Sequence, residues 1–267
     1  MREYLEVLDY VYSYGKKRKD RTGTGTVSVF SPPEICLEMS DGFPIVTTKR
    51  IAWKSVATEL LWFLRGETNN NWLRDRKVTI WDEWADEDGN LGPVYGAQWR
   101  RWRSHDGTEH DQIAEVIRQI RETPESRRIV VSAWNVGQLG EMALPPCHLL
   151  FQFYVDEDEL SLKVIMRSAD MFLGVPFNIA SYGLLLEIIA SITGKLPRKL
   201  ILSLGDAHIY LNHFDQVETQ LDRMSHLRPK LVLPPLHSLD DAVNLDIADI
   251  KLVNYMHHPA IHGEVSK

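Results

Sequence analysis

The sequence predicts an α+β fold, because helical and strand-like segments are interspersed without the regular alternation of a doubly wound sheet. Apolar residues repeat at helical spacing in some segments and alternate at strand spacing in others. The 267 residues are 44% hydrophobic and 25% charged, which is typical of a soluble globular protein. A chain of this length can bury a large core, and we expect a single domain over residues 1–267.

The N-terminal part of the chain predicts two helices and two short strands. Apolar side chains in residues 4–12 fall on one helical face, and Gly15 is expected to end that helix. Residues 27–30 and 35–37 read as short strands on either side of two prolines. A second helical stripe covers residues 56–64 and ends near a glycine.

The middle of the chain is less regular. Residues 69–111 are rich in Trp, Asp and Gly and have weak periodicity, which predicts a loop-rich insertion with short helical pieces. A clear amphipathic helix resumes at residues 113–120. Three acidic residues, 156–158, interrupt the next apolar region and predict a hairpin there. The strands expected in this region lie at residues 129–134, 149–155 and 160–165.

The C-terminal third is predicted to begin with a central buried helix. Residues 179–193 are apolar almost all round, and Gly194 is expected to end the helix. A strand is expected at residues 200–204, and a helical stripe follows at residues 210–221. The tail from Arg228 onward contains several prolines and two short strand-like pieces.

Composition argues against several function classes. The formal net charge of −7 disfavours a dedicated nucleic-acid-binding protein, because such proteins depend on basic surfaces. Two basic runs, residues 16–19 and 100–103, are therefore interpreted as solvated loops, although phosphate contact stays open for either. Cys36 and Cys147 are too few for a disulfide framework and lack metal-type spacing. We recognise no signal peptide and no apolar run of membrane-spanning length, so a cytoplasmic protein is expected.

Cys147 is the most informative residue, because it follows two prolines and comes just before a predicted strand. A thiol in that setting is either inert packing or a placed nucleophile. Arg127, Arg128 and Arg167 lie near it in the sequence. Cationic groups stabilise a thiolate and also bind phosphate, so one cluster could hold an anionic substrate and activate the sulfur.

Other polar residues are candidates of a weaker kind. Glu59 lies on an otherwise apolar helix, where a carboxyl group is costly unless it has a partner or a function. Structural interpretations stay open for the rest: His208 as a hydrogen-bonding side chain, and Asn178 as a helix N-cap. The pair Arg127 and Arg128 could form surface salt bridges instead of binding an anion.

A series of motifs then resembles the thymidylate synthase family over essentially the whole chain. These motifs lie at residues 20–26, 41–44, 47–49, 59–63, 80–84, 92–96, 126–128, 145–148, 167–170, 177–182 and 205–210. The resemblance implies a large mixed β-sheet flanked by helices and a homodimer formed through that sheet. It also implies a methyltransferase that converts dUMP to dTMP without a metal, with 5,10-methylenetetrahydrofolate as the carbon and hydride donor.

The resemblance also assigns roles to residues. The Cys147 thiolate would add to C6 of the uracil ring, which makes C5 nucleophilic. The implied catalytic residues are Cys147, Glu59, Tyr95, His148, Arg167 and Asn178. The implied dUMP-binding residues are Arg21, Arg127 and Arg128 (the last two from the second subunit), Arg167, Ser168, Asp170, Asn178, His208 and Tyr210. The implied folate-binding residues are Lys49, Ile80, Trp81, Asp170, Leu173, Gly174, Phe177 and Ser266.

Three positions depart from the family pattern: Ala52, Met166 and the terminal Lys267. A charged last residue would loosen the closed C-terminal lid and admit water, so that hydroxymethylation of dUMP to 5-hydroxymethyl-dUMP competes with methylation. The implied water shield Trp81 is present and favours methylation. A non-enzymatic RNA-binding protein and a cysteine hydrolase are more remote candidates. The hydrolase is disfavoured because neighbouring residues on a strand, Cys147 and His148, point to opposite faces.

Overall fold

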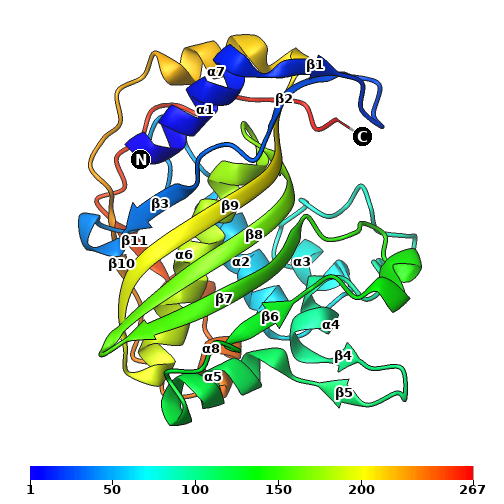
Figure 1. Ribbon diagram of the computed structural model, residues 1–267, viewed down its shortest axis with the longest axis vertical. Coiled ribbons are helices and arrows are strands. Elements are labelled where there is room, and N and C mark those ends of the chain that lie inside the picture. The colour runs from blue at the N-terminus through cyan, green and yellow to red at the C-terminus, as the bar shows by residue number, and fades with distance from the viewer. Residues whose placement is uncertain (267) are drawn as a thin grey trace.

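A large mixed β-sheet forms the centre of the fold (Figure 1). The structure, a computed structural model, describes residues 1–266, so the expectation attached to Lys267 lies outside the described residues. Within residues 1–266 this sheet has seven strands in the order β1-β2-β9-β8-β7-β6, and β3 also pairs with β9. β8 and β9 run parallel, and the other paired strands of this sheet are antiparallel. The α+β class and the large mixed sheet flanked by helices are therefore confirmed.

The strands of the large sheet differ greatly in length. They are β1 (Lys16–Arg18), β2 (Thr26–Phe30), β3 (Ile35–Glu38), β6 (Val130–Ser132), β7 (His148–Asp156), β8 (Glu159–Asp170) and β9 (Leu196–Tyr210). Two small antiparallel pairs lie apart from it: β4 (Trp102–Arg103) with β5 (Glu109–His110), and β10 (Lys230–Val232) with β11 (Lys251–Val253). The long strands β7, β8 and β9 carry the core of the sheet.

Helices cover one face of the sheet, behind it in Figure 1. The helices are α1 (Arg2–Tyr14), α2 (Trp53–Leu64), α3 (Asn71–Arg74), α4 (Tyr95–Arg100), α5 (Gln112–Glu122), α6 (Gly174–Thr193), α7 (Phe214–Leu221) and α8 (Leu239–Val243). Short 3₁₀ turns lie at η1 (Met39–Asp41), η2 (Val136–Glu141), η3 (Leu211–His213) and η4 (Ile247–Asp249). α6 packs against β8, β9 and α2, and the left-handed Gly194 ends it as predicted.

The sequence misplaces several element ends on the side of the sheet where β8 and β9 finish. β9 runs to Tyr210, so the expected strand at 200–204 is too short, and Tyr210 is not the start of a helix. α6 begins at Gly174 and not at residue 179. The basic run at residues 16–18 is an edge strand paired with β2 and not a loop. Polar side chains at these ends break the apolar periodicity on which the predictions rest.

The expectation that no apolar run has membrane-spanning length is wrong for one helix, judged by length and composition alone. α6 (Gly174–Thr193) is long and apolar enough to cross a bilayer, with a mean hydropathy of 1.6. However, 78% of this apolar stretch is buried inside the protein, where α6 packs against the sheet and α2. A core helix that is hydrophobic all round has the same composition as a membrane span, and burial identifies α6 as a core helix.

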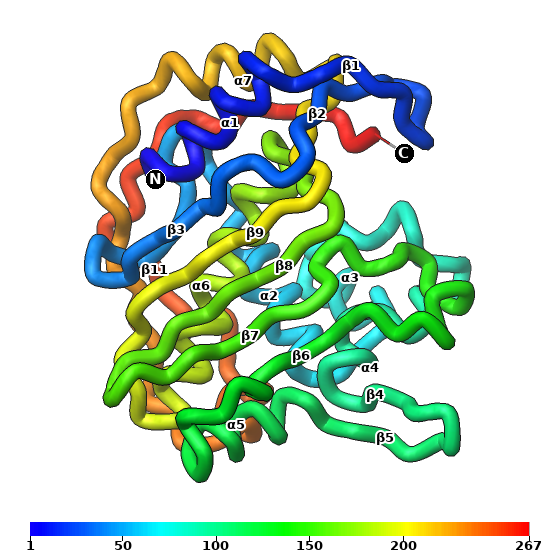
Figure 2. The backbone as a smooth tube through the Cα atoms, in the orientation of Figure 1, coloured from blue at the N-terminus to red at the C-terminus, as the bar shows by residue number. Residues whose placement is uncertain are grey.

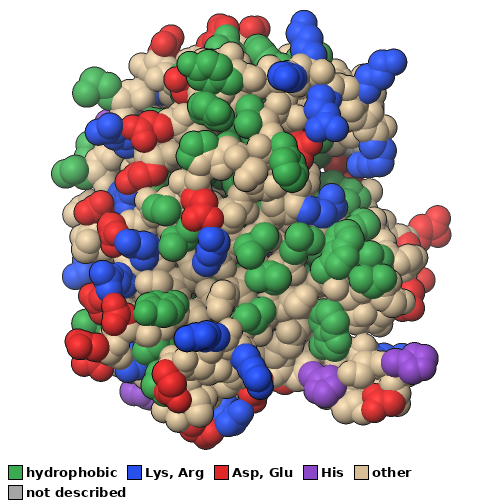
Figure 3. Space-filling model, in the orientation of Figure 1, with side chains coloured by type: hydrophobic (Ala, Val, Ile, Leu, Met, Phe, Trp, Pro, Cys, Tyr) green, Lys and Arg blue, Asp and Glu red, His purple; other side chains and the backbone are tan. Residues whose placement is uncertain are grey.

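Among residues 1–266, no helix lies over the other face of the sheet (Figure 1). Side chains on this face alternate with core residues along the strands: Gln152, Lys163, Ile201 and Cys36 are aligned across β7, β8, β9 and β3. Tyr154 lies on the same face and is 66% exposed. Figure 3 shows hydrophobic side chains gathered over this face among scattered charges. This face of the central sheet is therefore uncovered in the single chain and partly apolar.

Candidate active site

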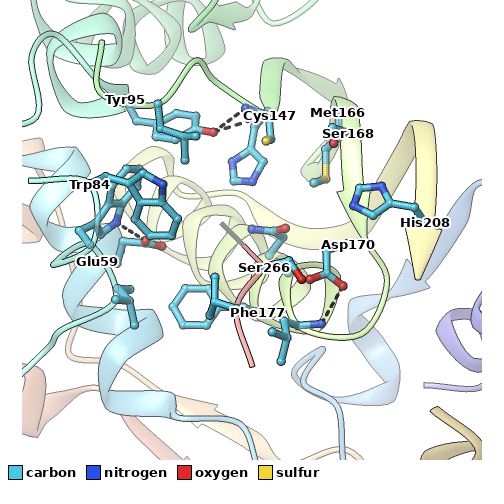
Figure 4. Close-up of a pocket in the computed structure, with 18 of the residues that line it drawn as sticks. Glu59, Trp84, Tyr95, Cys147, Met166, Ser168, Asp170, Phe177, His208 and Ser266 are labelled. Atoms are coloured by element: carbon cyan, nitrogen blue, oxygen red, sulfur yellow. Dashed lines mark hydrogen bonds between the residues drawn. The ribbon is translucent and has the colours of Figure 1, made fainter. Parts of the chain in front are cut away.

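One cavity collects most of the residues that the sequence singles out. It has a volume of about 380 Å³ and lies where β8 and β9 end and where β7 and α6 begin. In Figure 4, side chains from these elements, from α2 and from the C-terminal segment point toward it. The predicted residues that line it are Glu59, Ile80, Trp81, Tyr95, Cys147, His148, Ser168, Asp170, Leu173, Gly174, Phe177, Asn178, His208, Tyr210 and Ser266.

The backbone holds Cys147 at the wall of this cavity. Cys147 immediately precedes β7, and its N–H donates to the Tyr95 hydroxyl oxygen at 2.8 Å. Its carbonyl accepts the N–H of Arg167 on β8 at 2.9 Å. The guanidinium of Arg167 donates to the carbonyls of Pro146 and Pro145 at 2.8 and 3.1 Å. Tyr95 and Arg167 thus fix the backbone of Cys147 and of the two prolines before it, and with it the position of the sulfur.

Only part of the expected arginine cluster reaches the sulfur. An Nη2 of Arg167 lies 3.9 Å from Cys147 Sγ and acts to lower the pKa of the thiol. Burial has the larger effect, and the pKa of Cys147 is raised overall. Arg127 and Arg128 are exposed on the loop between α5 and β6 and do not line the cavity. Within a single chain, burial therefore favours the protonated thiol, and Arg167 is the cation that opposes this effect.

Glu59 is the buried carboxyl group of the site. It is 8% exposed on the apolar helix α2, and its Oε1 accepts the Trp81 indole N–H at 2.7 Å. Burial raises the pKa of Glu59 to about 7, although the Trp81 hydrogen bond opposes the rise. A carboxyl group with that pKa can both take up and release a proton near neutral pH.

His148 and Tyr95 form a neutral polar pair beside Cys147. Burial lowers the pKa of His148 to about 4, against a smaller opposite effect of a hydrogen bond with Asn178. Its Nδ1 lies 3.1 Å from the Tyr182 hydroxyl oxygen. Burial also raises the pKa of Tyr95, so its hydroxyl stays protonated. These groups can order water and relay protons without carrying charge themselves.

The parallel pairing of β8 and β9 brings a second group of polar residues together. Their ends meet at one edge of the sheet, and Asp170 pairs in register with His208. Asp170 Oδ1 accepts the backbone N–H groups of Phe172 and Leu173 at 2.9 and 3.1 Å, which fixes the turn before α6. His208 and Tyr210 rings lie 5.2 Å apart, edge to face. This end of the cavity is polar, whereas the opposite wall is aromatic.

The aromatic wall includes residues that the sequence did not single out. Trp84, Phe63, Leu144 and Val265 line the cavity beside the predicted Trp81, and Met166, one of the departures from the family pattern, lines it from β8. Trp81 and Trp84 rings meet edge to face at 5.9 Å. Trp84 belongs to the motif at 80–84, so the motif itself was the available signal.

Some predicted site residues lie away from the cavity. Lys49 is buried, with Nζ donating to the Phe172 carbonyl at 2.5 Å and lying 3.4 Å from the Phe172 ring centroid. Burial lowers the pKa of Lys49 to about 7. Arg21 is exposed on the loop between β1 and β2. Together with Arg127 and Arg128, these residues do not line the cavity of their own chain.

Sequence comparisons agree with the geometry of this site. The family model described as Thymidylate synthase matches residues 2–267. The chain belongs to the thymidylate synthase family. The thymidylate synthases of three Coxiella burnetii strains, Dugway 5J108-111, RSA 331 / Henzerling II and RSA 493 / Nine Mile phase I, are each 53% identical to it over 266 residues. Each alignment covers 100% of both chains.

The family expectation from the sequence is thus confirmed, and the structure clarifies two of the departures. Met166 is 2% exposed and pairs with His148 across β7 and β8, so it is packed beside the residue that follows Cys147. Ala52 is exposed at the N-terminal end of α2 and does not line the cavity. Within residues 1–266, no group of three or more His, Cys, Asp and Glu side chains is arranged to hold a metal ion.

Proposed function

We propose that this chain is a thymidylate synthase that converts dUMP to dTMP with 5,10-methylenetetrahydrofolate. The observation that carries the proposal is one cavity in which the Cys147 sulfur, next to Arg167, faces the same space as Glu59 and Asn178. The relatives that are 53% identical over the full length carry that name. Hydroxymethylation and RNA binding have no comparable support.

Cys147 would start the reaction by forming an S–C6 bond to the uracil ring. The C5–C6 electron pair then moves toward O4, and C5 becomes the nucleophile. Arg167, 3.9 Å from the sulfur, favours the thiolate needed for this step. Glu59, with a pKa of about 7, would exchange the protons at O4 and C5 through ordered water held near Tyr95 and His148. In the last step the C5–C6 double bond would form again as the S–C6 bond breaks, and the sulfur would leave with the bonding pair as the Cys147 thiolate.

Asn178 would select uracil. A side-chain amide can accept the N3–H and donate to O4, whereas cytosine presents the opposite pattern. The contact between Asn178 and His148 restrains the amide on the first turns of α6. Ser168, His208 and Tyr210 would bind the phosphate and sugar at the polar end of the cavity.

The aromatic wall fits a flat folate. When bound, 5,10-methylenetetrahydrofolate supplies the one-carbon unit and the hydride. Ile80, Trp81 and Trp84 on one side and Leu173 and Phe177 on the other offer apolar surfaces to its rings. The Asp170 carboxylate offers a hydrogen-bond acceptor beside them. Lys49, held against Phe172, would act on the folate only after leaving that carbonyl.

Product analysis tests this proposal. Incubation with dUMP and 5,10-methylenetetrahydrofolate, followed by mass spectrometry, should give dTMP and dihydrofolate. A product heavier by one oxygen, with tetrahydrofolate, would assign hydroxymethylation instead. Replacing dUMP by dCMP in a parallel reaction should give no product, because Asn178 cannot match the cytosine edge. Absence of any nucleotide product would reject the proposed function.

We further propose a homodimer that forms through the open face of the sheet. That face is partly apolar, with Tyr154 66% exposed, and exposed apolar surface is costly to leave in water. Arg127 and Arg128 are exposed at the edge of the sheet near β6 and cannot line their own cavity. In a two-fold dimer, a residue that is remote from its own site can reach the partner's site. These arginines would then bind the dUMP phosphate of the partner subunit.

Mixing two inactive variants should restore activity if the site is shared. The variants are Cys147→Ala and the double variant Arg127→Ala, Arg128→Ala, each expected to be inactive alone. After subunit exchange at equal amounts, half the dimers are mixed, and each has one intact site, so about one quarter of wild-type activity returns. Turnover assays of the mixture measure this. A mixture as inactive as its components, with exchange shown by native mass spectrometry, would contradict the shared site.

A further inference from the structure

The C-terminal segment reaches the cavity along η3 and α7. Figure 2 traces it as the red end of the chain. Gln216 on α7 donates to the carbonyl of His262 at 3.4 Å, and Nε2 of His213 lies 2.8 Å from the carbonyl oxygen of Glu264. The next two residues, Val265 and Ser266, line the cavity. The contact with His213 is therefore made directly before the part of the tail that walls the site.

His213 is an unusual histidine because it is fully buried at 0% exposure. Its ring packs against the Phe172 ring at 5.0 Å and the Tyr210 ring at 5.9 Å. Only Nε2 has a partner, and Nδ1 is a buried nitrogen without a hydrogen bond among the described residues. Because a carbonyl oxygen only accepts, Nε2 must carry the proton and donate it to Glu264. The packing thus leaves the ring a single polar contact, which is with the tail.

Gly263 provides the second half of this contact. A Cβ added there would lie 2.8 Å from Cε1 of Phe172 and 2.9 Å from Nε2 of His213. Real Cβ atoms do not approach that closely, so the tail lies flush against the two rings only because residue 263 has no side chain. A side chain at this position would push the backbone away from His213 and lengthen its hydrogen bond to Glu264.

We infer that His213 and Gly263 anchor the C-terminal segment and thereby position Val265 and Ser266 over the cavity during the reaction. His213 is a positioning residue here and does not touch the substrate. The same rings link the anchor to the site, since Tyr210 lines the cavity and Phe172 lies in the turn fixed by Asp170. A seated tail narrows the path by which water enters beside the aromatic wall. The effect on the reaction rests on the proposed function, whereas the anchoring of the tail by His213 does not depend on it.

Four variants separate the anchor from general packing. His213→Phe keeps an aromatic ring between Phe172 and Tyr210 but removes the donor. His213→Gln replaces the ring and keeps an N–H near the position of Nε2, so it is the rescue variant. Gly263→Ala adds the obstructing methyl group. Thr219→Ala is the matched control, because Thr219 is exposed on α7 and its hydroxyl donates to the Asp215 carbonyl of the same helix.

The first readout is independent of activity. Carboxypeptidase Y trims the full-length protein, and mass spectrometry follows the loss of the terminal residues. Removal of one hydrogen bond to the Glu264 carbonyl should speed trimming of His213→Phe and Gly263→Ala by about three- to tenfold. His213→Gln should stay closer to the wild-type rate, and Thr219→Ala should match it. Equal trimming rates for His213→Phe and the wild type would overturn the anchor.

The second readout is catalytic. His213→Phe should raise the KM for 5,10-methylenetetrahydrofolate by about the same three- to tenfold factor and release some 5-hydroxymethyl-dUMP. The affinity for dUMP alone should not change, because a phenyl ring still packs against Tyr210 and the proposed dUMP contacts come from β8, β9 and α6 and not from the tail. A parallel loss of dUMP affinity and thermal stability would assign His213 a merely structural role and reject positioning. If the wild type makes no dTMP, the proposed function fails, and the trimming rates still decide the anchor.

Discussion

Replacing Cys147 with alanine should lower turnover by about 10⁴-fold or more, while the affinity for dUMP stays within a few-fold of wild type. The sulfur is the proposed nucleophile, and among the residues described as lining the cavity Cys147 has the only thiol. The proposed phosphate and sugar contacts are made by Ser168, His208 and Tyr210 and by the partner subunit's Arg127 and Arg128, and the change removes none of them. Steady-state kinetics gives the rate, and calorimetric titration with dUMP gives the affinity.

The second cysteine supplies the control. Cys36 is exposed on β3, on the open face of the sheet, and does not line the cavity. Cys36→Ser should therefore keep the wild-type rate per folded enzyme, and only Cys147 should form a covalent adduct detectable by intact mass. A Cys147→Ala enzyme that retains substantial turnover would show that the reaction needs no covalent bond to this sulfur.

The sequence predicts the elements best where one face is consistently buried. The stripes in α1 and α5 and the alternation in β7 follow simple periodicity, and their positions agree with the structure within a few residues. β8 and β9 extend further than predicted because their last residues, including Ser168 and His208, face a polar cavity and not the core. The polar residues at these strand ends break the apolar pattern that predicts a strand, and the same residues line the candidate site.

The arginines illustrate what sequence proximity cannot give. Arg127, Arg128 and Arg167 all lie within a short stretch around Cys147, which suggested one cluster. In the fold, Arg167 on β8 lies beside the sulfur, whereas the other two point to solvent before β6, an edge strand. Strand order places them, and a single sequence does not specify strand order.

His213 shows a different limit. It stands in no motif quoted for the family resemblance, and a lone histidine in a helical stripe reads as ordinary packing. Its contact with Glu264 joins residues 51 positions apart. Glu59, in contrast, could be singled out at once, because a carboxyl group on an apolar helix conflicts with the cost of burying charge. Conflicts of that kind are visible in a sequence, and long-range hydrogen bonds are not.

Glu59→Gln should make the protein more stable above neutral pH while lowering its activity. The pKa of Glu59 rises from 4.5 to about 7 on folding, so the folded state resists ionisation, which corresponds to about 3 kcal/mol of lost stability at pH 8. Glutamine is neutral and can still accept the Trp81 N–H. Urea unfolding at fixed protein concentration across pH 4 to 8 measures the difference.

The sign of the pH dependence is specific to a raised carboxyl pKa. Below pH 4.5 the group is protonated in both states, and the variant and wild type should be equally stable. Between pH 4.5 and 7 only the unfolded state ionises, so the wild type loses stability relative to the variant, and above pH 7 the gap stays constant. Glu115→Gln is the control, because Arg118 lowers the pKa of that exposed carboxyl, and its removal should bring no gain at pH 8. A Glu59→Gln curve parallel to wild type at every pH would mean that Glu59 ionises freely in the folded protein and could not retain the proton it is proposed to transfer.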